Sequence, residues 1–124
     1  ARVTLAAVER GGRPDVRSQA ALASIEAAAG DREGARTRAE RIAQGSYMDH
    51  HVAYSLAATW AQLGDMTAAL RWLKEAGDSG FPCVRCIEVD RLLDPVRTQP
   101  EFQAALASMK KRVERDAGRS AQNR

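Results

Sequence analysis

Apolar residues recur every three or four positions in two separate stretches of the chain, residues 18–29 and 52–63. An α-helix turns once every 3.6 residues, so this spacing places the apolar side chains on one face of a helix. Each stretch is followed by a glycine, Gly30 or Gly64, which suits the left-handed conformation that often ends a helix. The pattern therefore predicts two amphipathic helices with defined ends.

A second helix is predicted after each of these glycines. Asp31 and Asp65 are suited to cap the first turn of a helix, because an aspartate side chain accepts hydrogen bonds from the free backbone N–H groups there. Apolar and small residues then continue at helical spacing over about 32–43 and 66–76. The chain is thus predicted to contain two helical hairpins.

The two hairpins are related by a constant shift of 34 residues, which takes Gly30-Asp31 to Gly64-Asp65. A fixed period of this length indicates a repeat protein. Small residues recur where the paired helices are predicted to cross, and a larger side chain there would push the helices apart. The small residues at the crossings are Ala23 and Ala57, and Ala35 and Ala69. Other pairs related by the same shift are Leu22 and Leu56, Ala39 and Leu73, and Ile42 and Ala76.

A helical hairpin with this period and these residues resembles the tetratricopeptide repeat family, and Trp60 strengthens the match of the second unit. The resemblance implies an all-α fold, a right-handed α-α superhelix closed by a C-terminal capping helix. It implies that 1–116 form one domain, that the native protein extends before Ala1, and that the array is the C-terminal end of one from a bacterial signalling protein. The expected parts are 1–12 (second helix of a preceding repeat), 17–46 and 50–80 (repeats), 81–116 (closing segment and cap) and 117–124 (flexible tail).

The closing segment is expected to depart from the repeat. We predict a short helical turn near 87–93, a loop around Pro95, and a final helix from about Pro100 to Arg115. Its apolar face is expected to cover the last repeat. That face comprises Phe102, Leu106, Met109 and Val113.

Composition supports helices and excludes several classes. Alanine occurs 24 times and is the best helix former, whereas aromatic residues make up only 5% of the chain. We therefore exclude β-sandwiches and barrels, and no apolar run is long enough to span a membrane. No signal peptide is apparent, so the expected compartment is the cytoplasm. Trp60 and Trp72 are expected to pack in the core.

Charge changes the picture only at the C-terminus. The net charge is +3, and the basic excess lies in the last helix and tail, from Lys110 onward. Contact with nucleic acid through this helix is one alternative function. The last helix lacks the interleaved aromatic residues that a nucleic-acid-binding surface usually carries.

We expect no enzymatic activity, because the sequence has no nucleophile motif and no phosphate-binding glycine loop. No cofactor is expected. Two cysteines do not make a disulfide framework, and the main interpretation of Cys83 is packing beside Phe81. Two alternatives stay open: a metal site formed by Cys83, Cys86, His50 and His51, and a redox pair of the two cysteines.

The family resemblance implies a concave groove lined by the first helix of each repeat. Such a groove suits a peptide or a partner domain, and we expect a protein–protein interaction scaffold. In the alternative, this region is an intramolecular regulatory end of a multidomain kinase, cyclase or transcriptional regulator. The expected lining residues are Arg17, Ala20, Ser24, Ala27, His51, Tyr54, Ala58 and Gln62.

Overall fold

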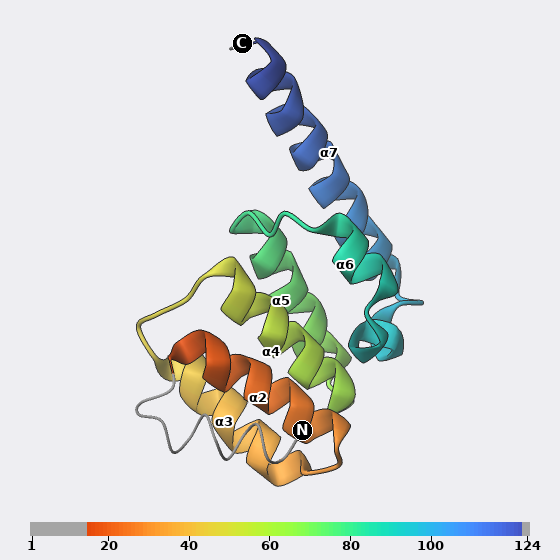
Figure 1. The fold of residues 1–124 in the computed structure, drawn as a ribbon. Coiled ribbons are helices and arrows are strands. Elements are labelled where there is room, and N and C mark those ends of the chain that lie inside the picture. Colours follow the sequence, from red (N-terminus) through yellow and green to blue (C-terminus); the bar gives the residue numbers. More distant parts are fainter. Residues whose placement is uncertain (1–14, 123–124) are drawn as a thin grey trace.

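A computed structural model describes residues 15–122, and this part of the chain is all-helical with no β-strand. The early helices stack against one another, and the far half of the last helix projects from the body (Figure 1). The elements are α2 (Val16–Ala28), α3 (Arg32–Gln44), α4 (His50–Gln62), α5 (Met66–Asp78), α6 (Val84–Val89), the 3₁₀ helix η1 (Arg91–Val96) and α7 (Pro100–Gln122). The expected helix of 1–12 lies outside the described residues.

The predicted helix ends are confirmed. Gly30 and Gly64 have φ angles of 96° and 82°, in the left-handed region that favours glycine. The Asp31 side chain accepts a hydrogen bond from the backbone N–H of Gly34, and Asp65 accepts one from Ala68. Local sequence therefore sets the corner of each hairpin.

The small residues at the helix crossings are confirmed as core. Ala23, Ala35, Ala57 and Ala69 are fully buried, and α2 packs on α3 as α4 packs on α5. Alanine allows the backbones to approach closely, and a larger side chain would have to displace a packed neighbour.

The two tryptophans pack in and against the core, as predicted. Trp60 is buried, and the guanidinium of Arg36 lies 5.4 Å from its ring centroid. Trp72 is half-buried against the core, with the Arg71 guanidinium 5.3 Å from its ring.

The repeat period continues past the second hairpin, which the sequence analysis did not anticipate. First helices begin at Val16, His50 and Val84, and second helices begin at Arg32, Met66 and Pro100. The segment after Gly80 is therefore a third unit in register with the other two, with α6 and η1 in the place of one continuous first helix.

Two residues account for the break between α6 and η1. Asp90 stands one period after the buried Leu56, and its side chain instead caps η1 by accepting a hydrogen bond from the Leu92 N–H. Pro95 stands one period after the buried Ala61, and proline has no N–H to donate to a helix. The predicted turn at 87–93 and loop around Pro95 are therefore wrong in detail, since Pro95 lies inside η1.

The apolar face of α7 covers the body as predicted. Phe102, Leu106 and Met109 are buried, whereas Val113 is 41% exposed. The helix continues to Gln122, beyond its predicted end at Arg115 and into the segment expected to be a flexible tail. Within the described range, no helix is long and apolar enough to cross a membrane.

Candidate binding groove

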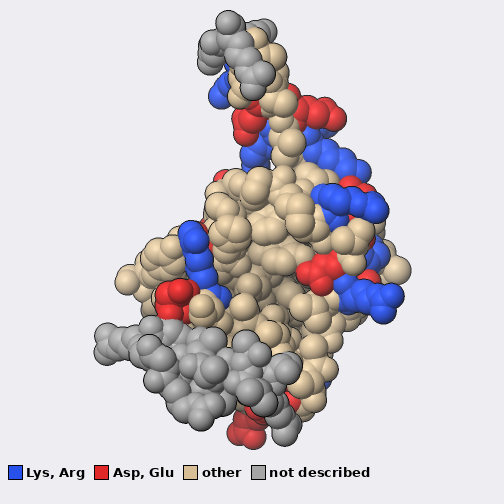
Figure 2. Space-filling view, viewed as in Figure 1, with Lys and Arg blue, Asp and Glu red and all other residues tan. Residues whose placement is uncertain are grey.

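An open hollow of about 700 Å³ lies between the first helices of the three units, α2, α4 and α6. Uncharged atoms cover the middle of the face seen in Figure 2, and charged side chains gather at its edges and on the projecting part of α7. The hollow is lined mostly by apolar surface. Its lining residues are Arg17, Ala21, His51, Tyr54, Ser55, Phe81, Cys86, Val89 and Asp90.

Three of the eight predicted groove residues line this hollow: Arg17 from α2, and His51 and Tyr54 from α4. They come together because α2 and α4 pack side by side and start at the same point of successive repeats. They were predicted from the family resemblance together with the repeat register.

Four predicted lining residues are buried instead. Ala20 and Ala58 are 0% and 1% exposed, and Ser24 and Ala27 are also buried. Ala20 and Ala58 belong to the packed core between the helices, and the Ser24 hydroxyl donates to the carbonyl of Ala21, 2.7 Å away. These four residues hold helices together and offer no open surface to a partner.

The far end of the predicted groove is occupied by the third unit itself. The side-chain amide of Gln62 donates to the carbonyl of Leu92 at 2.9 Å, and η1 packs along α4. The open groove is therefore shorter than the sequence analysis predicted, and it is confined to the end where the first helices begin.

The floor of the groove is aromatic. The rings of Tyr54 and Phe81 are stacked, with centroids 4.5 Å apart and planes 9° apart. His51 meets Phe81 edge-on at 6.1 Å. Sequence reasoning placed Phe81 in packing only, although its position directly after Gly80, which has a φ of 95°, turns it back toward α4.

Tyr54 also connects the floor to the third unit, because its hydroxyl donates a hydrogen bond to the carboxylate of Asp90. Burial raises the pKa of Tyr54 above its ordinary value, and this hydrogen bond raises it further. The hydroxyl therefore stays protonated and acts as a fixed donor. The sequence did not single out Asp90, because the contact joins residues 36 positions apart.

At the α2 edge, Arg17 is paired rather than free. Its Nε lies 2.6 Å from Oδ2 of Asp49, which also accepts from the Tyr47 hydroxyl at 2.8 Å. Burial raises the pKa of Asp49, but hydrogen bonds from Val52, Tyr47 and Arg17 outweigh it and leave the pKa well below its usual range. Asp49 caps α4 and anchors this edge of the groove.

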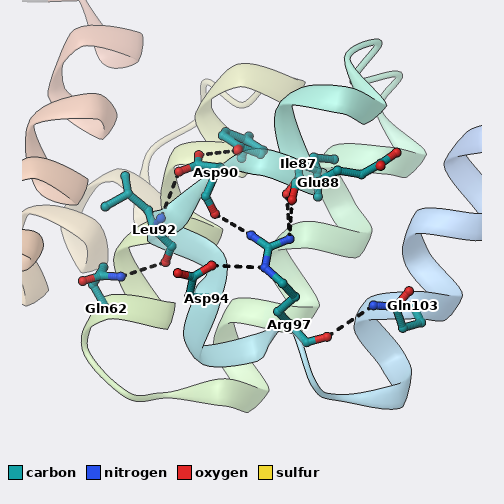
Figure 3. Close-up of polar contacts among 9 residues, drawn as sticks. Gln62, Ile87, Glu88, Asp90, Leu92, Asp94, Arg97 and Gln103 are labelled. Carbon is teal, nitrogen blue, oxygen red and sulfur yellow. Dashed lines mark hydrogen bonds and ion pairs between the residues drawn. The ribbon is translucent and has the colours of Figure 1, made fainter.

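The opposite wall is α6, which presents Cys86 and Val89, the latter 55% exposed. Arg97 holds the end of this short helix (Figure 3). Its guanidinium donates to the carbonyls of Glu88 and Asp90 at 2.8 and 2.6 Å. A six-residue helix is marginal alone, so these bonds keep the wall in place.

The two cysteines are joined by a disulfide, which corrects the interpretation of Cys83 as a packing residue alone. Their Cα atoms are 5.3 Å apart, because a spacing of three residues brings side chains together on the first turn of a helix. Within residues 15–122, no group of three or more His, Cys, Asp or Glu side chains could hold a metal ion.

A second hollow, of about 570 Å³, lies between α5 and α7. Its charged residues are largely engaged with one another, since Asp78 pairs with Lys74 at 2.7 Å and with Arg112 at 3.4 Å. It contains none of the predicted site residues.

No known protein family, curated protein or solved structure was found to match the chain.

Proposed function

We propose that this chain is a non-enzymatic interaction module that holds an extended segment of a partner protein in the groove between α2, α4 and α6. The observation that carries the proposal is an exposed apolar wall beside a fixed aromatic floor. Val89 is 55% exposed, and it lines the same open hollow as the stacked pair Tyr54 and Phe81. Binding is favourable when a partner covers exposed apolar surface in a concave site, because apolar surface is then removed from water.

Two polar groups of the groove are held in structural contacts, which favours a role in binding for them. The Tyr54 hydroxyl is engaged by Asp90, and Arg17 is engaged by Asp49. A general acid or base needs a group that can exchange a proton with a substrate, and these groups are already committed to structural contacts. Their fixed positions instead favour the recognition of a partner's backbone and side chains.

The architecture that we propose is a short right-handed superhelix of tetratricopeptide-like hairpins. Helix starts that recur at one fixed period over three units support it, as do the small residues at the crossings. In such an array the first helices line one surface, which is where the groove lies. The same groove would serve the regulatory alternative, in which the bound segment belongs to the same polypeptide.

The basic helix α7 supports contact with nucleic acid less well than the groove supports binding of a partner protein. Lys110 lies 3.5 Å from Glu88, and Arg112 pairs with Asp78, so part of its charge is already used within the fold. Contact with nucleic acid is dominated by free basic groups that neutralise phosphates. We therefore favour partner binding in the groove over nucleic-acid contact through α7.

A displayed library of random peptides, selected against the full chain, tests the proposal. Selected peptides should lose at least about tenfold in affinity for Val89→Glu, because the new charge lies on the apolar wall. Val113→Glu is the matched control, since Val113 is also an exposed valine but lies on α7 outside the groove. Failure to enrich any peptide, or equal losses for both variants, would refute the groove as the site.

A further inference from the structure

The Cys83–Cys86 disulfide is an asymmetric feature of the groove wall that the proposed function does not use. Cys86 is exposed and lines the open hollow, whereas Cys83 is partly buried against the core. Between them, the Arg85 side chain is 79% exposed and lies 3.7 Å from the carboxylate of Glu88. The two ends of the bond thus differ in exposure, and Cys86 is the more exposed residue.

We propose that this disulfide is a thiol–disulfide exchange site, attacked at Cys86 by an external dithiol that enters through the groove. The proposal goes beyond peptide binding and stands whether or not the groove also holds a partner segment.

The exchange balances as two displacements. A thiolate of the dithiol attacks Sγ of Cys86, the bond between the two cysteines breaks, and Cys83 leaves as a thiolate that takes a proton from water. The second thiolate of the dithiol then attacks the dithiol sulfur that is bonded to Cys86. Cys86 is released as a thiolate, which takes a proton from water. The protein disulfide is reduced to two thiols, and the dithiol is oxidised to its own disulfide.

The surroundings of Cys83 suit it as the leaving group. Its Sγ accepts a hydrogen bond from the backbone N–H of Cys86 at 3.2 Å, and a hydrogen bond to the charged form favours a departing thiolate. The rate of exchange depends on which sulfur is accessible and on how well the other sulfur leaves. Exposure and hydrogen bonding therefore favour the same direction of attack.

Reduction does not require the fold to open. Ile87 anchors α6 with a fully buried side chain, and Arg97 holds the far end of the helix through the carbonyls of Glu88 and Asp90. We therefore expect α6 to stay folded when the bond at its start is broken.

The first test treats the full oxidised chain with dithiothreitol at neutral pH without denaturant. Free thiols are then trapped with iodoacetamide and counted by intact mass. Two alkyl groups per chain with an unchanged helical circular dichroism spectrum are expected. A disulfide that is reduced only after denaturant is added would overturn the proposal.

The second test locates the attacked sulfur in the oxidised chain, which is treated with reduced glutathione while iodoacetamide traps the released thiol. Fragment mass spectra then show which cysteine carries glutathione and which carries the alkyl group. Glutathione on Cys86 with the alkyl group on Cys83 should exceed the reverse arrangement at least about fivefold. Equal amounts, or glutathione mainly on Cys83, would overturn the assignment of Cys86 as the attacked sulfur.

Discussion

The first helix of the second unit and the corresponding segment of the third unit begin in the same register and then differ. α4 runs without interruption from His50 to Gln62. The segment from Val84 to Val96 is divided into α6 and η1 at Asp90. The start of a helix depends on its first-turn residues, whereas its continuity depends on every interior position.

The break shapes the far end of the groove. Asp90 takes the register position of the buried Leu56, leaves the helix and reaches the Tyr54 hydroxyl of α4. η1 then folds along α4 and closes the far end of the groove. A third unit with an unbroken first helix would not place these contacts where they are.

The largest expected effect comes from moving the residue that breaks the third unit into the second. Leu56→Asp would place a charge at a fully buried position and should lower the free energy of unfolding by about 3–5 kcal/mol. Urea unfolding followed by circular dichroism measures it. Leu56→Met is the control and should cost less than about 1.5 kcal/mol. Equal stability of the two variants would contradict the explanation of the break.

A proline transplanted in the same way should have the next largest effect. Ala61→Pro removes a hydrogen bond inside α4 and should cost about 3 kcal/mol in urea unfolding. The converse change, Pro95→Ala, should alter stability by less than about 1 kcal/mol, because the Leu92 carbonyl in η1 already accepts from Gln62. A similar cost for both changes would show that proline does not distinguish the two units.

Removing the side chain that holds the broken segment should have a smaller effect. Arg97→Ala leaves the carbonyls of Glu88 and Asp90 without their donor and should cost about 2 kcal/mol. Hydrogen exchange should also become faster for the amides of α6. Arg91→Ala changes an exposed arginine of η1 and is the control. If the amides of α6 exchange at the same rate in both variants, Arg97 does not hold α6 in place.

The smallest effect concerns the cap of α4, where Asp49 occupies the place that Cys83 takes in the third unit. The pKa of Asp49 is lowered in the folded state, so its carboxylate stabilises the fold above the unfolded pKa of about 3.9. That stabilisation is lost as the pH falls through the folded pKa. Asp49→Asn keeps a capping side chain but loses the ion pair with Arg17, so it should cost up to about 1 kcal/mol at pH 7.

The stability difference between this variant and the unaltered chain should shrink as the pH is lowered from 7 to 2, because the unfolded chain takes up the proton first and part of the stabilisation from the charge is then lost. Urea unfolding at the two pH values measures the difference. A gap between the two proteins that does not change with pH would contradict a role for the Asp49 charge.

The groove was only partly predictable from the sequence. Arg17, His51 and Tyr54 follow from the repeat register, because helix starts fix which residues share one end of the array. Ala20 and Ala58 were placed in the lining although they are core. Alanine suits both a helix crossing and a shallow surface, so residue type does not separate the two environments.

The sequence by itself determined the helical hairpins and their repeat period. Capping aspartates, left-handed glycines and apolar periodicity act within a few residues of each other, so they can be read along the chain. Only the tertiary structure decided which part of the first-helix surface stays open. That outcome depends on contacts between distant residues, such as Tyr54 with Asp90 and Gln62 with Leu92, and local pattern does not encode which distant groups meet.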